Sequence, residues 1–224
     1  KIKDMPSIDL NERQLCDLEL LMNGGFAPLT GFLGQADYDG VVDNMRLASG
    51  ALWPMPITLD ITEKVSETLT LGEQVVLRDP EGVPLAVMDV EEMFTPDKDK
   101  EAEMVYGAND LAHPAVRFLH NQTGNVYLGG AVTGIDEPVH YDYRQHRYTP
   151  NDLRRMFHKW GWRRVVAFQT RNPLHRAHVE LTVRAAQLTE ANLLIHPVVG
   201  LTTPGDVDHF TRVRCYDAVL RHYP

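Results

Sequence analysis

A change in hydrophobic period near residue 147 constrains the fold of this chain more than any other feature of its sequence. Before it, short alternating apolar runs such as Ile57 to Thr62 are separated by turns; after it, apolar runs of strand length at 164–169 and 192–199 flank a helical segment. Alternation with period two is typical of half-buried strands, whereas a strand, helix, strand order indicates a parallel sheet. We therefore expect two units, residues 1–147 and residues 148–224, with different folds.

The first unit begins with a predicted helix and continues as strands. Asn11 is a good N-cap with Gln14 as its capping-box partner, and Gly24 with Gly25 ends the helix, so we predict a helix over residues 11–23. The Pro/Gly turn at 79–82 predicts a hairpin between strands at 74–78 and 83–90.

Further strands are predicted at Val126–Leu128 and at Ala131–Val132, between glycines. Strands at this spacing with no long helix between them favour a small antiparallel barrel. We interpret the charged stretch at 97–103 as a solvated loop or helix face, and residues 136–147 as the connection between the units.

The second unit has the pattern of an α/β domain. Thr149 and Pro150 start a helix that should turn Leu153, Phe157 and Trp160 toward a core. A helix over about 173–189 then connects the two strands, and a last helix is expected near 209–222. A parallel sheet covered on both faces normally has more than two strands. We therefore expect an incomplete domain from a longer protein.

Composition excludes several classes. The 224 residues carry a formal net charge of −9, and no apolar run approaches the roughly 18 residues of a membrane helix. The first residues lack the apolar segment of a signal peptide. Two cysteines, Cys16 and Cys215, form neither a disulfide framework nor a Cys-x-x-Cys pair. We expect a cytoplasmic protein with no membrane association.

The net charge is divided unevenly along the chain. Residues 1–147 hold 11 basic and 25 acidic side chains, a balance of −14, whereas residues 148–224 hold 11 basic and 6 acidic ones, a balance of +5. This asymmetry indicates that the second unit handles a negatively charged ligand.

The densest group of reactive side chains runs from Gln169 through Thr170 and Arg171 to His178, where the predicted strand 164–169 gives way to a helix. Ligands of open parallel sheets bind at this carboxyl edge. We expect Asn172 to cap the helix with Pro173 at its first position, so that free backbone N–H groups point toward the ligand. His175 and His178 are three residues apart and should share a face.

These residue types suit a phosphate site. Arginine, imidazole and a helix N-terminus can neutralise transferring oxygens, and the segment holds no paired Ser or Cys nucleophile and no adjacent carboxylates. Phosphoryl or nucleotidyl transfer therefore fits best. Taken singly, Asn172 with Pro173 could be an ordinary helix start and each histidine a solvated side chain, but their combination in ten residues exceeds chance.

Other readings of nearby residues stay open. A zinc pair of His175 and His178 lacks the glutamate and the spacing of the His-Glu-x-x-His motif. Asp206 with Asp208 could ligate a metal, but Asp208 as a helix N-cap is the simpler interpretation, and we predict no protein-bound metal. Arg212 and Arg214 could face the substrate or lie on a solvated face.

Three segments resemble the ATP sulfurylase (sulfate adenylyltransferase) family: residues 168–178, residues 197–209 and residues 23–33. The first is highly specific, and together they span nearly the whole chain. The resemblance implies an α/β plus β architecture, in which an amino-terminal PUA-like β-barrel is followed by the start of a Rossmann-like nucleotidyltransferase α/β domain. It also implies synthesis of adenylyl sulfate (APS) and pyrophosphate from ATP and sulfate, in sulfate assimilation or reversed in sulfur oxidation.

The resemblance further implies roles for individual residues. Gln169 and Arg171 would bind sulfate, and Gln169, Thr170, Arg171 and Asn172 would contact ATP. Thr170, Arg171 and Asn172 are the family's active-site positions, and His175 and His178 would stabilise the transition state. Mg²⁺ would enter with ATP, without a tightly bound cofactor, and a homo-oligomer with no nucleic-acid partner is expected.

One departure and two alternatives accompany this resemblance. The family's Gly-Arg-Asp-His motif is missing from the sequence, as is the Gly-x-x-x-x-Gly-Lys-Ser/Thr loop of the adenylylsulfate kinase domain that some members carry. Another nucleotidyltransferase with a His-x-Gly-His motif is an alternative, weakened by Ala177 at the glycine position. An RNA-binding PUA module is a second alternative, which the −14 balance of residues 1–147 disfavours.

Overall fold

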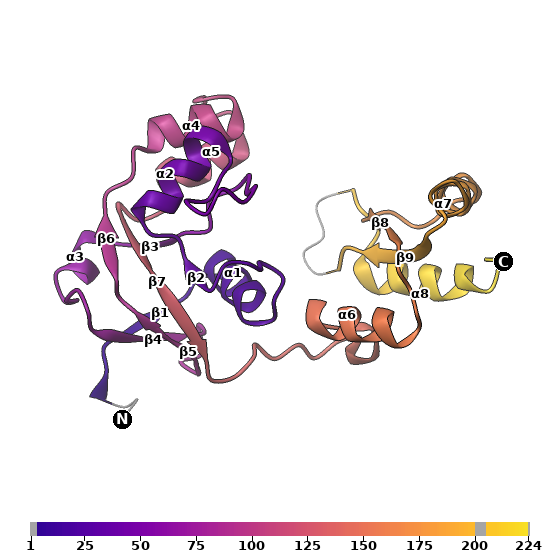
Figure 1. The fold of residues 1–224 in the computed structure, drawn as a ribbon, viewed down its shortest axis with the longest axis horizontal. Coiled ribbons are helices and arrows are strands. Elements are labelled where there is room, and N and C mark those ends of the chain that lie inside the picture. The colour runs from indigo at the N-terminus through magenta and orange to yellow at the C-terminus, as the bar shows by residue number, and fades with distance from the viewer. Residues whose placement is uncertain (1–3, 200–204, 224) are drawn as a thin grey trace. The chain divides into compact units, whose positions relative to one another are not determined.

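The computed structural model describes residues 4–199 and 205–223 (Figure 1). The chain divides into two compact units, Lys1–Asn151 and Asp152–Pro224, which we call unit 1 and unit 2. The division falls in the first turn of α6 (Pro150–Lys159), a helix that begins at Pro150 as the sequence predicts.

Unit 1 is built on one mixed sheet of seven strands. Its main path has the order β1-β4-β5-β7-β2, and β3 and β6 also pair with β7. The strands are β1 (Ser7–Asp9), β2 (Gly31–Phe32), β3 (Leu59–Ile61), β4 (Gln74–Arg78), β5 (Pro84–Asp89), β6 (Glu92–Phe94) and β7 (Val126–Gly134). The predicted hairpin of β4 and β5 is confirmed, with Val76 opposite Val87.

The long strand β7 organises this sheet. The sequence predicts two strands here, but Val126–Gly134 forms one, because Gly129 and Gly130 continue it where a side chain would not fit. A Cβ atom at Gly130 would lie 1.9 Å from the carbonyl oxygen of Asp89. Glycine therefore lets β7 run past the bend that joins β5 to β6.

The sheet is a curled half-barrel, which differs from the expected small antiparallel barrel in its pairing and in its edges. β1 pairs with β4 in parallel, and among the described residues β1 and β2 lie at opposite ends of the strand order without pairing. The parallel pairing follows from the connection, since a long segment that includes α1 separates β1 from β4.

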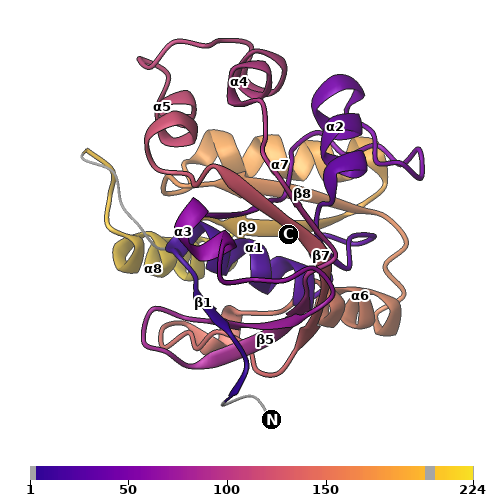
Figure 2. The same ribbon diagram turned by 90° about the vertical axis from the view of Figure 1, so that its left-hand side faces the viewer.

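Five helices accompany the described part of this sheet: α1 (Glu12–Met22), α2 (Gln35–Asn44), α3 (Glu63–Ser66), α4 (Lys98–Tyr106) and α5 (Pro114–Asn121). The predicted capping box of α1 is confirmed, with the Gln14 N–H 3.0 Å from Asn11 Oδ1 and the Asn11 N–H 3.0 Å from Gln14 Oε1. Helices α2, α4 and α5 gather at one end of unit 1 (Figure 2).

The core of unit 1 has two main parts. The larger packs α1 against the sheet through buried Leu18 and Leu21. The second surrounds Tyr38, Phe94 and Tyr127, whose rings lie within 5.8 Å of one another and meet at steep angles. Edge-to-face contacts of this kind stabilise a core beyond the apolar area that they bury.

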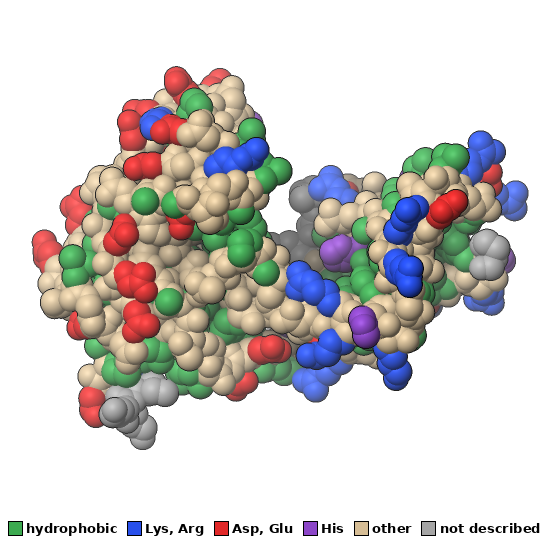
Figure 3. Space-filling model, viewed as in Figure 1, with side chains coloured by type: hydrophobic (Ala, Val, Ile, Leu, Met, Phe, Trp, Pro, Cys, Tyr) green, Lys and Arg blue, Asp and Glu red, His purple; other side chains and the backbone are tan. Residues whose placement is uncertain are grey.

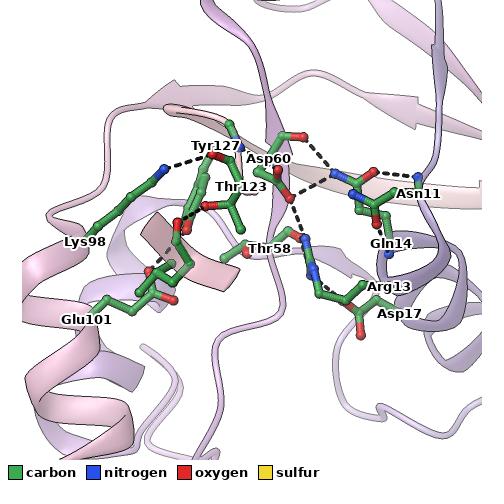
Figure 4. A network of polar contacts seen from close by, with 12 residues as sticks. Asn11, Arg13, Gln14, Asp17, Thr58, Asp60, Lys98, Glu101, Thr123 and Tyr127 are labelled. Atoms are coloured by element: carbon green, nitrogen blue, oxygen red, sulfur yellow. Dashed lines mark hydrogen bonds and ion pairs between the residues drawn. The ribbon is translucent and has the colours of Figure 1, made fainter. Parts of the chain in front are cut away.

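A buried polar network connects α4 and α1 to the sheet (Figure 4). Glu101 accepts hydrogen bonds from the hydroxyls of Tyr38 at 2.7 Å and Tyr127 at 3.2 Å. On the α1 side, Arg13 and Gln14 donate to Asp60. Residues 97–103 are the N-cap and first turns of α4, which agrees with the interpretation of this charged stretch as a helix. The helix is not wholly solvated, however, because Glu101 is only 4% exposed.

Unit 2 contains a parallel pair of strands with helices around it. The order is α6, β8 (Val165–Thr170), α7 (Arg176–Thr189), β9 (Asn192–Pro197) and α8 (His209–Leu220). β8 pairs with β9 in parallel along its whole length, and α7 connects them and packs on both. The predicted strand, helix, strand unit is therefore confirmed.

Little of unit 2 is fully buried. The described residues of β8 and β9 are half-buried or exposed, and the buried side chains of the unit include Val213 and Tyr216 on α8. Trp160 is 51% exposed, so the expectation that it points into a core is wrong. Its ring instead tilts against Trp162 at 5.2 Å, and Trp162 stacks on Phe157.

Within residues 4–199 and 205–223, no helix combines the length and the apolar character that crossing a bilayer requires.

Candidate active site

The candidate site lies at the carboxyl end of β8, in the loop of residues 171–175 that leads into α7. The sequence predicts that Asn172 caps this helix, but α7 begins at Arg176 with His175 as its N-cap. The reason lies in the loop, where the Asn172 N–H donates to Thr170 Oγ1 at 3.1 Å and the Asn172 carbonyl accepts from the Tyr216 hydroxyl at 2.7 Å. These bonds hold Asn172 outside the helix.

His175 and His178 meet at the start of α7, as the sequence predicts. Their ring centroids are 5.4 Å apart, and the backbone N–H of His175 donates to Nδ1 of His178 at 3.1 Å. Because Nδ1 accepts this bond, a neutral His178 carries its proton on Nε2. That nitrogen is a donor at the positive end of the helix, where negative oxygens are stabilised.

Arg171 stands at the entrance to the loop with a largely exposed side chain. Its Nε lies 3.6 Å from Oδ2 of Asp206, a carboxylate in the segment that precedes α8. This ion pair engages one edge of the guanidinium. A bidentate contact with an oxyanion would use two of the N–H donors of the fork.

Gln169 is the next-to-last residue of β8 and pairs in register with His196 of β9. Residues that pair directly across two strands project on the same side of a sheet, and both of these side chains are exposed. The sequence predicts a role for Gln169 and gives none to His196, because only the register of the parallel pair brings the two together.

Helix α8 contributes two residues to the site. The sequence leaves open whether Arg212 faces the substrate or the solvent, and it gives no role to Tyr216. Arg212 is 1% exposed, and its Nη1 donates to the Arg171 carbonyl at 2.8 Å. It therefore does not lie on a solvated face, whereas Arg214 is exposed. Tyr216 is also buried and is the donor to Asn172.

The two aspartates before α8 have separate roles. Asp208 is the N-cap of α8, accepting from the Thr211 N–H at 2.9 Å. This bond is the main reason that the pKa of Asp208 lies below its usual value. Asp206 pairs with Arg171. Within the described parts of the chain, no group of three or more His, Cys, Asp or Glu side chains is placed to hold a metal ion.

The surface charge of each unit follows its sequence. Acidic side chains gather over the visible face of unit 1, and lysines and arginines over that of unit 2 (Figure 3). Unit 2 therefore presents the surface better suited to anions.

Comparison with known proteins gives this arrangement a family. Residues 1–137 match the PUA-like domain model, and residues 144–224 match the ATP-sulfurylase model. The fold and the site thus define a PUA-like domain followed by an ATP-sulfurylase segment. Residues 144–224 therefore belong to the ATP-sulfurylase family and residues 1–137 to the PUA-like domain family, so the resemblance seen in the sequence is confirmed.

Curated relatives carry the name sulfate adenylyltransferase. The chain is 56% identical to the protein of Mycosarcoma maydis over 223 residues, 98% of this chain and 39% of the relative. It is 54% identical to the protein of Schizosaccharomyces pombe over 222 residues, 98% of this chain and 45% of the relative. The chain thus spans less than half the length of these relatives.

A solved structure titled "Hexameric APS kinase from Thiobacillus denitrificans" is also similar. Its TM-score is 0.76 at 34% sequence identity, over 99% of this chain and 40% of that one. The similarity therefore extends over the fold of the whole chain.

Proposed function

We propose that this chain takes part in sulfate adenylyl transfer, in which ATP and sulfate form adenylyl sulfate and pyrophosphate. The observation that carries the proposal is the loop after β8, which has the exposed Arg171 guanidinium at its start and leads to the His178 donor in the first turn of α7. Membership of the ATP sulfurylase family supports it.

The chemistry requires charge neutralisation more than proton transfer. A sulfate oxygen attacks the α-phosphorus of ATP, the new P–O bond forms, and the bond from the α-phosphorus to the bridging oxygen breaks, so that pyrophosphate leaves with the electron pair. Sulfate is already deprotonated at neutral pH, and the attack needs no general base. Two anions must instead be held in line while charge develops on the leaving group.

The residues divide these tasks. We propose that Gln169 and Arg171 bind sulfate, and that Gln169, Thr170, Arg171 and Asn172 contact ATP. His175 and His178 stabilise the transition state through ring N–H donors at the helix N-terminus. Mg²⁺ enters bound to the nucleotide phosphates and water, as this ion commonly does.

The proposal also assigns a domain to each part of the chain. We propose a PUA-like domain over residues 1–147 and a Rossmann-like nucleotidyltransferase segment over residues 148–224, the latter carrying the site. A cytoplasmic homo-oligomer is proposed as the working form, since one similar structure is described as hexameric.

The proposal is tested by sulfate-dependent exchange of labelled pyrophosphate into ATP. Because the chain spans less than half of its curated relatives, the experiment uses a protein of the relatives' full length that contains this chain. Exchange that requires sulfate supports the proposal. A folded protein that exchanges pyrophosphate only with pantetheine phosphate or nicotinamide mononucleotide would contradict it.

A further inference from the structure

Arg212 is a buried cation, and no carboxylate among the described residues forms an ion pair with it. Its side chain is 1% exposed, Nη1 binds the Arg171 carbonyl, and Nε and Nη2 are buried without a hydrogen-bond partner among the described residues. A guanidinium stays protonated in proteins, and burying one unpaired carries a large free-energy cost. If the side chain at this position served only to fill space in the core, an apolar side chain of similar size would make the protein more stable.

Tyr216 acts on the same loop from one turn further along α8. Its hydroxyl donates to the Asn172 carbonyl at 2.7 Å, and burial raises its pKa, so it remains a donor. The Thr170 carbonyl accepts from the Val198 N–H at 2.9 Å. Three consecutive carbonyl oxygens, those of residues 170–172, are thus all bound.

Binding these carbonyls sets the direction of the loop's N–H groups. In a trans peptide the carbonyl of one residue and the N–H of the next point in opposite directions. The Arg171 N–H is therefore directed away from the Thr170 carbonyl. The carbonyl oxygens of the loop are thus engaged. Because the Asn172 N–H donates to Thr170 Oγ1 and Pro173 has no N–H, the Arg171 N–H is the backbone donor of residues 171–173 that has no partner among the described residues.

We propose that Arg212, assisted by Tyr216, is a positioning residue for anion binding by the loop at 170–172. It fixes the Arg171 backbone, and with it the starting point of the Arg171 side chain. This inference rests on the proposed function, because sulfate is the anion that Arg171 is proposed to bind.

Four variants of the full-length protein separate positioning from simple core filling. Arg212→Met removes the donors and the charge at similar length, and Arg212→Lys keeps the charge. Tyr216→Phe removes only one hydroxyl. Arg214→Met is the matched control, since Arg214 lies on the same helix with an exposed side chain.

The first readout is the KM for sulfate and kcat. We expect Arg212→Met to raise the KM for sulfate at least tenfold, Arg212→Lys to recover part of that loss, and Arg214→Met to stay within twofold of the wild type. A residue that only fills the core would lower the thermal midpoint and the yield of active enzyme while leaving this KM unchanged. An unchanged KM in folded Arg212→Met overturns the inference.

The second readout needs neither activity nor a stable Arg212→Met variant. Hydrogen–deuterium exchange of the segment 169–175 should be faster in Tyr216→Phe than in the wild type and Arg214→Met, because one carbonyl of the loop is released. Equal exchange rates overturn the inference. A wild type without sulfate-dependent exchange would overturn only the proposed function, since loop protection is measured independently.

Discussion

Glu101 illustrates how burial changes the behaviour of one charged residue. Its carboxylate lies in the core of unit 1, where burial raises its pKa above the usual 4.5 despite the hydrogen bonds from Tyr38 and Tyr127 that oppose the rise. Folding therefore favours the protonated form. The stabilising contribution of this proton is complete below pH 4.5 and is lost as the pH rises through the raised pKa.

We predict that Glu101→Gln removes this loss of stability. Glutamine keeps an oxygen for the tyrosine hydroxyls but does not ionise. The thermal midpoint of the variant, relative to the wild type, should therefore rise as the pH increases from 4.5 through the raised pKa of Glu101, and should level off above that pKa.

The control is Glu103→Gln, an exposed neighbour on α4. Its midpoint should differ from that of the wild type by the same small amount at every pH. A Glu101→Gln difference that does not change with pH would show that the carboxyl titrates alike in the folded and unfolded chains.

At the scale of an element, the first turn of α7 joins stability to chemistry. His178 accepts the His175 N–H through Nδ1, which leaves Nε2 for substrate. Asparagine can replace the acceptor at Nδ1 but not the donor at Nε2. We predict that His178→Asn lowers kcat by about 100-fold or more, the usual effect of losing one transition-state donor, with little change in thermal midpoint.

His178→Ala should lose both properties. Besides the fall in kcat, loss of the cap should cost roughly 0.5–2 kcal/mol of stability. His158→Asn, which changes an exposed histidine of α6, is the control and should leave both quantities unchanged. Normal kcat in His178→Asn would remove Nε2 from the chemistry.

The contact of β2 with β7 gives a second prediction at this scale. A Cβ atom at Gly31 would lie 1.9 Å from the carbonyl oxygen of Gly130, a backbone atom that cannot turn aside. Gly31→Ala should therefore cost about 1–3 kcal/mol, the usual range for overpacking, measured by urea denaturation.

Gly34→Ala is the matched control. There the nearest atoms belong to the end of the exposed Glu92 side chain, which can move, so the cost should stay under about 1 kcal/mol. Equal losses in the two variants would mean that the β2 backbone moves to admit the methyl group.

Local signals in the sequence predict several elements but not their exact contacts. Asn11 with Gln14 predicts α1, and the turn at 79–82 predicts the β4–β5 hairpin, because caps and tight turns depend on neighbouring residues. The start of α7 is predicted three residues early, since Tyr216, 44 residues away, holds Asn172 out of the helix. Long-range contacts of this kind leave no local pattern.

The same distinction applies to the candidate site. Gln169, Arg171 and His178 are close in sequence at a strand end, so their clustering is predictable. Arg212 is not, because its position on α8 is equally compatible with a solvated face until burial and the Arg171 contact are known.

At the scale of the whole molecule, the net charge of −9 conceals two opposite surfaces. Residues 1–147 carry −14 and residues 148–224 carry +5, and the proposed anion site lies in the basic part. The net charge of the whole chain would therefore suggest, contrary to the proposed function, that the protein binds anions such as ATP and sulfate poorly.

Sulfate-dependent exchange of pyrophosphate into ATP by Arg171→Ala, compared with the wild type, tests this account most directly. The full-length wild-type protein should exchange only when sulfate is present, and Arg171→Ala should lose at least 100-fold of that rate while keeping the wild-type thermal midpoint. Near-normal, sulfate-dependent exchange by a folded Arg171→Ala variant would contradict the placement of the anion site at the end of β8.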